Sequence, residues 1–108
     1  MLGEKYVRRT YNAFRSKYWP DAGMPDFEEL DFEFAENPGE FGSVEWDEHG
    51  NASMSLDPSL RVSRPLLRAV LLHEMAHIRL GPGFGHGRQF YAEALRVCGL
   101  GGIREVFC

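Results

Sequence analysis

The stretch VLLHEMAHIRLGPGFGHGRQF, residues 70–90, holds three of the four histidines of this 108-residue chain. Its first part belongs to residues 66–80, which are apolar on almost every side and predict a central, buried helix. Positions four apart on a helix lie one turn above each other, so His73 and His77 direct both imidazoles to one point. A cation shared by the two rings satisfies polar groups whose burial without partners would cost about 1–3 kcal/mol each.

A third ligand has to come from outside this helix, because the position one turn beyond His77 is Gly81, which has no side chain. The glycines of GPGFGHG, residues 81–87, allow a sharp reversal of the chain. His86 can then approach the two rings from the start of a second helix, expected at residues 87–98. Glu93 on that helix is the alternative third ligand. Three protein ligands leave the fourth position of a tetrahedral zinc ion open to water, as in catalytic sites.

Glu74 follows His73 directly and lies about 100° round the helix from it, beside the expected metal position. His-Glu-x-x-His is the pattern in which two histidines bind zinc and the glutamate polarises a water on the metal. Zinc lowers the pKa of such a water to about 7. Glu74 would take its proton and later deliver it to the leaving amine. The pattern therefore predicts one Zn²⁺ per chain and hydrolytic chemistry with Glu74 as the base.

Working outward, the chain shows helical and strand periodicities on both sides of this stretch. Residues 3–19 predict an amphipathic helix. Residues 30–36 alternate acidic and apolar side chains, as in a strand with one buried face. Residues 43–46 and 52–56 predict a β-hairpin with Gly50 in its turn.

Further residues have positions that suggest local roles. Ser63 is placed to cap the central helix and Pro65 to occupy its first turn. Gly99 is expected to end the second helix. Helical spacing places Phe90, Tyr91, Ala94 and Leu95 in the core, although Tyr91 could instead hydrogen-bond an oxyanion. His49 is expected to be a solvated turn residue.

Length and composition predict one compact domain, residues 1–108. We expect it to be a monomer. No apolar stretch approaches the roughly 20 residues of a membrane span. Cys98 and Cys108 are too few for a disulfide-stapled secreted scaffold, so we expect a reducing, cytoplasmic location.

Charge is distributed unevenly along the chain. Residues 21–60 carry 12 of the 16 acidic residues and no Lys or Arg. The basic flanks could bind nucleic acid or an acidic partner. The simpler interpretation is that a basic first helix and an acidic sheet neutralise each other within the fold.

The quoted stretch resembles the active-site region of SprT-like zinc metallopeptidases, in which the His-Glu-x-x-His helix is followed by a loop, a His-Gly pair and an aromatic residue. His86, Gly87 and Phe90 match that pattern, and ASMSLDPSL, residues 52–60, resembles the strand and connector before the metal helix. The similarity covers about residues 41–98.

The resemblance implies an α+β, minimal zincin fold with an N-terminal helix, a small three-stranded twisted sheet, a buried metal-binding helix and a C-terminal helix. It also implies that His73, His77 and His86 are the metal ligands and Glu74 is the base. Substrate would lie extended along an edge strand built from NASMSLD, residues 51–57. Some relatives act on proteins crosslinked to DNA, but this chain has no Cys-x-x-Cys pairs and no basic tail.

The expected function is a zinc-dependent endopeptidase that hydrolyses flexible or unfolded segments of a peptide or protein substrate. The alternatives are a non-catalytic, zinc-stabilised protein-binding module and a DNA-associated SprT-like protease. A further hypothesis concerns the tail GIREVFC, residues 102–108. The thiolate of Cys108 or the terminal carboxylate could occupy the open zinc position and block the site.

Overall fold

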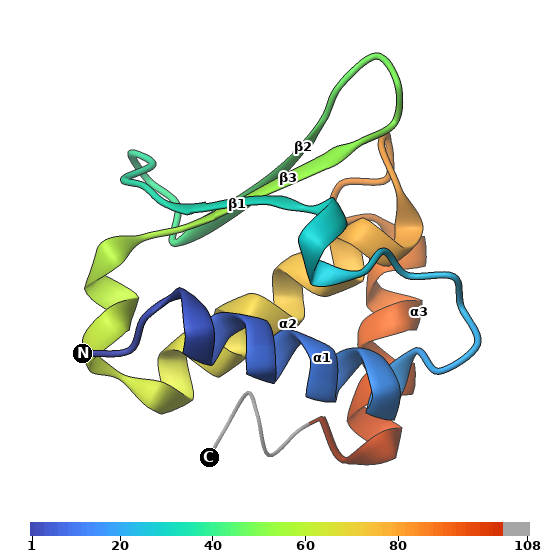
Figure 1. The fold of residues 1–108 in the computed structure, drawn as a ribbon. Coiled ribbons are helices and arrows are strands. Elements are labelled where there is room, and N and C mark those ends of the chain that lie inside the picture. The colour runs from blue at the N-terminus through green and yellow to red at the C-terminus, as the bar shows by residue number, and fades with distance from the viewer. Residues whose placement is uncertain (103–108) are drawn as a thin grey trace.

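The computed structural model describes residues 1–102, whose fold is drawn in Figure 1. It contains three helices and a small three-stranded mixed sheet, so the α+β class predicted from the sequence is confirmed. In chain order the elements are α1 (Glu4–Tyr18), β1 (Asp31–Phe34), β2 (Gly42–Trp46), β3 (Ala52–Leu56), α2 (Arg64–Leu80) and α3 (Arg88–Val97). Short 3₁₀ turns at Phe27–Glu29 and Pro58–Val62 precede β1 and α2.

The strand order β1-β3-β2 places β3 in the middle of the sheet. β3 pairs in parallel with β1 and antiparallel with β2, so that Met54 lies between Phe32 and Val44. The expectation that residues 51–57 form an edge strand is therefore wrong. The alternation of side chains reveals which face of a strand is buried, but not which strands flank it. β2 and β1 are the two edges.

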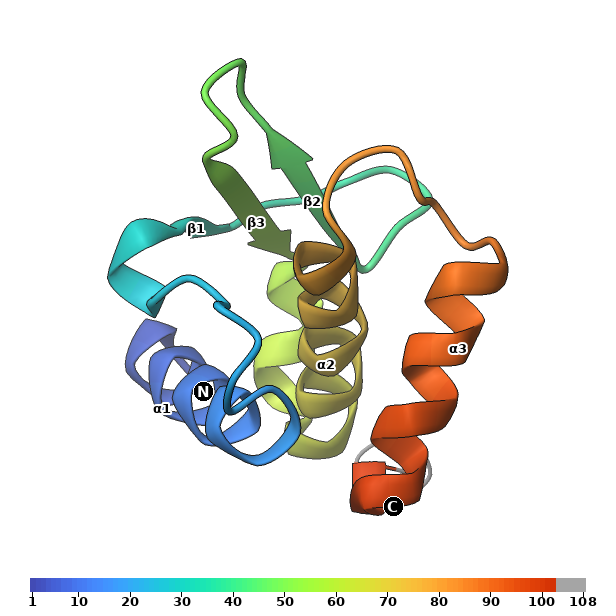
Figure 2. The ribbon, with the colours of Figure 1, turned by 90° about the vertical axis from the view of Figure 1, so that its right-hand side faces the viewer.

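α2 is the central helix, as predicted, with α1 on one side, α3 on the other and the sheet across its upper end (Figure 2). Leu67, Leu71 and Met75 recur four residues apart and are fully buried. The hydroxyl of Ser63 caps the helix by accepting a hydrogen bond from the Leu66 amide at 3.3 Å, and Pro65 lies in the first turn. This packing holds α2 in place, and the side chains of its second half include His73, Glu74 and His77.

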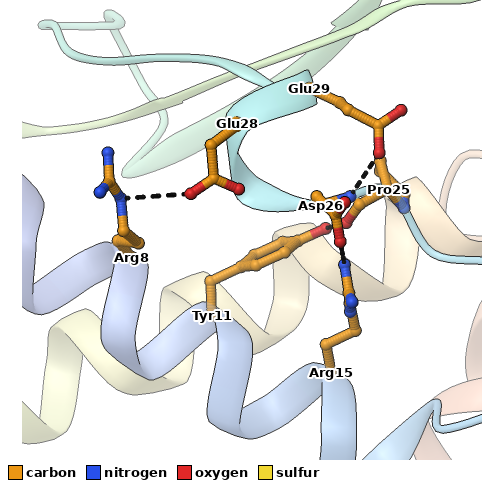
Figure 3. A network of polar contacts seen from close by, with 7 residues as sticks. All are labelled: Arg8, Tyr11, Arg15, Pro25, Asp26, Glu28 and Glu29. Carbon is orange, nitrogen blue, oxygen red and sulfur yellow. Dashed lines mark hydrogen bonds and ion pairs between the residues drawn. The ribbon is translucent and has the colours of Figure 1, made fainter.

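α1 is joined to the acidic segment by the polar contacts drawn in Figure 3. Arg8 pairs with Glu28 at 3.7 Å, and Arg15 pairs with Asp26. The hydroxyl of Tyr11 donates to the main-chain oxygen of Pro25 at 2.7 Å. These two pairs neutralise part of the charge of the first helix, but their acidic partners lie before β1 and not in the sheet, where they were expected from the sequence.

Only a narrow stripe of the α3 surface is buried, so the expectation that Tyr91 and Leu95 belong to the core is wrong. Phe90 and Val97, seven residues apart, are buried, whereas Tyr91 is 62% and Leu95 74% exposed. The helix packs mainly on α2, so only one stripe of its surface is buried. After α3 a further helical turn runs from Cys98 to Gly102, and the left-handed residue there is Gly101, with φ of +103°, instead of the expected Gly99.

The structure bears on two expectations from the sequence, namely the absence of a membrane span and the state of the cysteines. Within residues 1–102, no helix is long and apolar enough to cross a membrane. Cys98 has a free thiol. Cys108, and with it the hypothesis that the tail blocks the site, lies outside the described residues.

Candidate metal centre

The structure brings His73, His77 and His86 together. The first two project from the second half of α2, and the third comes back from the loop before α3. Their Nε2 atoms form a nearly equilateral triangle, with separations of 3.0 Å between His73 and His86, 3.2 Å between His73 and His77, and 3.1 Å between His77 and His86. Each ring thus turns the same nitrogen to one common point.

The loop between α2 and α3 achieves this return through glycines in conformations that other residues rarely adopt. Gly81, Gly83 and Gly85 have φ angles of +87°, +92° and +51°. The amide of Gly81 donates to the main-chain oxygen of His77 and ends α2. Side chains with a Cβ are disfavoured in this left-handed region, so the alternating glycines of the sequence are what allows the reversal.

The donor set fits a zinc ion. Tetrahedral coordination with Zn–N bonds of 2.0–2.1 Å places ligand nitrogens about 3.3 Å apart, close to the separations of the triangle. A neutral imidazole has only one N–H, so three Nε2 atoms at mutual contact cannot all be satisfied by each other. A cation above the triangle would accept all three lone pairs. Imidazole nitrogen is a suitable ligand for zinc, as it is for copper, iron and nickel.

Phe90 of α3 forms an apolar floor under this triangle. Its ring centroid lies 4.8 Å from that of His73, 4.5 Å from His77 and 5.0 Å from His86, and with His77 the rings are stacked. Phe90 itself is 6% exposed. One buried aromatic ring therefore restrains the orientation of all three imidazoles, which explains in physical terms why an aromatic residue follows the His-Gly pair.

The histidine rings are less buried than the sequence predicts. His73 and His86 are exposed and His77 is half-buried, because all three line an open pocket instead of the core. The protein around them still removes water. Burial, followed by the proximity of His77 and His86, lowers the pKa of His73 to about 4. Burial and then His86 also lower the pKa of His77. Neutral imidazole is the form that binds metals.

Glu74 is almost fully buried, with 6% of its surface exposed, and it lines the same pocket. Burial, and secondly the charge of Glu40, raise its pKa to about 7. A cation held by the neighbouring histidines would act in the opposite direction, because a nearby positive charge favours the carboxylate. The arrangement combines a potential proton acceptor with a potential metal position on a single helix.

The pocket has a volume of about 930 Å³ and is mostly apolar. Its walls are β2 on one side and the loop and α3 on the other, with α2 between them, an arrangement that can be followed in Figure 2. In the hairpin, the main-chain oxygen of Phe41 accepts a hydrogen bond from the Asp57 amide, and the amide of Asp47 donates one to the Asn51 oxygen. Gly42, Val44 and Trp46 alternate with these positions, so their main-chain groups point to the free edge of β2.

Several residues considered from the sequence are not part of this cluster. Glu93 accepts hydrogen bonds from Trp19 at 2.6 Å and from Arg96, so the structure does not bring it to the histidines. Tyr91 is not among the residues that line the pocket. His49 is exposed in the hairpin turn, as predicted.

Reasoning from the sequence missed two residues beside Glu74, namely Gly42 and Glu40. Glu40 precedes β2 and Gly42 is its first residue, and no spacing relates them to the metal motif. The resemblance, whose coverage begins near residue 41, includes Gly42 but not Glu40. Comparisons of the chain with protein-family models, curated proteins and solved structures found no match.

Proposed function

We propose that this chain is a zinc-dependent endopeptidase with a minimal zincin fold of the SprT-like type. The observation that carries the proposal is the triangle of Nε2 atoms, 3.0–3.2 Å apart, on the wall of a pocket that also contains the buried carboxylate of Glu74. A structural zinc site has four protein ligands, whereas three histidines leave a position open. Among the described residues, His73, His77 and His86 could form such a three-ligand set, and Glu74 of the same pocket is the proposed base.

The substrate in this proposal is a flexible or unfolded protein segment. Gly42, Val44 and Trp46 can offer main-chain hydrogen bonds along the free edge of β2, which is the edge strand nearest to the histidines. Strand addition of this kind depends on the backbone and makes few demands on sequence, but it requires an extended, unpaired segment. The apolar lining of the pocket adds contact area for side chains of that segment.

The proposed chemistry assigns one role to each group. When bound, zinc supplies Lewis acidity, which polarises the peptide carbonyl and makes water a better nucleophile at neutral pH. His73, His77 and His86 hold the ion through Nε2. The Glu74 carboxylate removes a proton from the attacking water and then delivers it to the nitrogen of the leaving amine. Glu74 is almost fully buried, so the proton that it takes from the attacking water is less readily lost to bulk solvent before it reaches the leaving amine.

Elemental analysis of the purified protein tests the metal site. We expect about one zinc per chain in the wild type and in Glu93→Ala, and a loss of zinc in His86→Ala. Glu93→Ala is the matched control, because it removes a carboxylate of the next helix that lies outside the triangle. Absence of bound zinc from every sample, even after reconstitution, would make the histidines structural and the proposal wrong.

Hydrolysis of a fluorescently labelled, unfolded casein by the zinc-loaded protein tests the activity. Glu74→Gln should keep the metal and lose activity by a factor of about 10²–10⁴, the usual contribution of a general base. A zinc-stabilised binding module would instead retain metal in both proteins, bind the casein and cleave it in neither. That outcome would replace the peptidase with its non-catalytic alternative.

A further inference from the structure

Gly42, the first residue of β2, lies directly against the side chain of Glu74. A Cβ atom built at Gly42 would be 3.0 Å from Val70 Cγ1, 3.1 Å from Glu74 Cγ and 3.2 Å from Glu74 Oε2. Carbon atoms in favourable contact are roughly 3.5–4.0 Å apart. No side chain other than hydrogen therefore fits between the strand and the carboxylate without movement of one of them.

The backbone of Gly42 does not itself require glycine. The glycines with left-handed φ angles among the described residues are Gly23, Gly39, Gly50, Gly81, Gly83, Gly85 and Gly101, and Gly42 is not one of them. Any residue could adopt its extended conformation within β2. The need for glycine is thus the close approach of the strand to α2, at the level of Glu74.

We propose that Gly42 is a positioning residue, which fixes the Glu74 carboxylate in the pocket by letting the main chain of β2 pack directly against it. The inference rests on the proposed function, because it assigns the contact to the base of that reaction. A methyl group at position 42 would meet both Cγ and Oε2 of Glu74 and displace the carboxylate. The three atoms nearest to this methyl group belong to Val70 and Glu74, and not to His73 or His77.

The same residue also faces the proposed substrate. The main-chain N–H and C=O of Gly42 point to the free edge of β2, where the peptide would pair, while its hydrogen side faces Glu74. One residue thus sets the distance between the bound peptide backbone and the base. A misplacement of about 1 Å between reacting groups can cost about 100-fold in rate, so this distance matters more for turnover than for binding.

Steady-state hydrolysis of the labelled casein by zinc-loaded Gly42→Ala is the first test. The neighbouring atoms have to move by a few tenths of an ångström, so we expect kcat to fall about 4- to 10-fold, with KM changed by less than about twofold and zinc still at one per chain. Gly99→Ala is the matched control, because a Cβ at Gly99 meets nothing within 4 Å and its φ is not left-handed. This control should keep the wild-type kcat and KM.

A double-mutant cycle measured by urea unfolding is the second test, and it does not depend on activity. Gly42→Ala should lower the unfolding midpoint in the wild-type background. The shift should become smaller when Glu74→Ala has already removed Cγ and Oε2, because only the contact with Val70 Cγ1 then remains. If Gly42→Ala alone fails to fold, recovery of folding in the Gly42→Ala/Glu74→Ala protein supports the same contact. An equal shift in both backgrounds would place the clash elsewhere and overturn the proposal.

The failure of this inference and that of the proposed function give different results. An active wild type with Gly42→Ala at full kcat overturns the positioning role and leaves the peptidase intact. A rise in KM with unchanged kcat would also overturn it, since Gly42 would then serve substrate binding alone. A wild type that binds zinc and cleaves nothing overturns the proposed function, and the positioning role falls with it.

Discussion

At the scale of single residues, Glu93 illustrates how the same carboxylate can suggest a metal ligand in the sequence and serve the fold in the structure. It accepts hydrogen bonds from the indole of Trp19, which is 3% exposed, and from Arg96. The cation of Arg96 also lies over the Trp19 ring, 5.8 Å from the centroid. The group ties the end of α1 to α3, two elements far apart in sequence.

Glu93→Ala should therefore lower the free energy of unfolding by about 1–3 kcal/mol, because the Trp19 N–H loses its partner in a buried place. Urea titration monitored by tryptophan fluorescence measures the change. Glu93→Gln keeps an acceptor for Trp19 and should lose less. Equal stability of all three proteins would contradict the proposed tie between α1 and α3.

The stabilisation by Glu93 should also depend on pH. Burial raises the pKa of Glu93, but hydrogen bonds from Arg96 and Trp19 outweigh it, and the net pKa is lowered. A carboxyl with a lowered pKa stabilises the fold above its unfolded-state pKa of about 4.3, and this contribution is lost as the pH falls through the folded value. The stability gap between wild type and Glu93→Gln should accordingly narrow on acidification below about pH 4.

The residues of the candidate site differ in how far the sequence predicts them. His73, Glu74 and His77 are related by helical spacing, which is local, so their common position follows once the helix is assigned. His86 follows from the glycines before it. Gly42 is different, because nothing near it in sequence reveals that its strand approaches Glu74. Contacts between distant segments depend on the whole packing arrangement and leave no periodic signal.

At the scale of elements, the loop of residues 81–87 is the part of the site most sensitive to backbone geometry. Gly83→Ala forces a Cβ into a conformation with φ of +92°. The strain costs about 1–2 kcal/mol and opposes the arrangement that delivers His86. We expect the dissociation constant for zinc to rise roughly tenfold, which competition with a chromogenic chelator can measure.

Gly87→Ala is the control for this loop, because its φ of −80° is open to any residue. It should keep zinc affinity within about a factor of three of the wild type, since Ala costs only a modest amount at a helix N-cap that lacks a side-chain bond. Equal losses in Gly83→Ala and Gly87→Ala would show that the loop tolerates no substitution and that left-handed geometry is not the cause.

The order of strands is the element-scale feature that the sequence does not predict. Residues 43–46 and 52–56 indicate a hairpin through their alternation and the turn at Gly50, and the structure has this hairpin. Whether β1 joins β2 or β3 depends on the path of residues 35–41, which carry no strand pattern. For this reason the proposed substrate edge is β2, and not the segment 51–57 expected from the sequence.

At the scale of the whole molecule, bound zinc should contribute to stability, because the triangle joins α2 to the segment that leads into α3. A ligand that binds only the folded state adds roughly 3–4 kcal/mol when its concentration exceeds the dissociation constant 100- to 1,000-fold. Treatment with EDTA should lower the thermal midpoint of the wild type by several degrees or more. His86→Ala should unfold at the same temperature with and without EDTA.

Two of the acidic residues in the segment 21–60 pair with arginines of α1. Arg8 and Arg15 face Glu28 and Asp26 across the contact between α1 and the segment before β1. The side chains are largely exposed, so each pair contributes little, at most about 1 kcal/mol. The two ion pairs join α1 to the segment before β1 at the place where the buried rings of Tyr11 and Phe27 are in contact.

Because β1 pairs in parallel with β3, and not with the next strand in sequence, the pairing affects the order in which the strands are expected to fold. β2 and β3 are joined by a short turn and can close within about 1–10 μs, whereas β1 must wait for β3 to be in place. We therefore expect β1 to be the last strand to pair, although it is the first to be synthesised. Phe32 and Phe34 would be exposed until then, and the acidic residues that alternate with them would oppose aggregation of the unpaired segment.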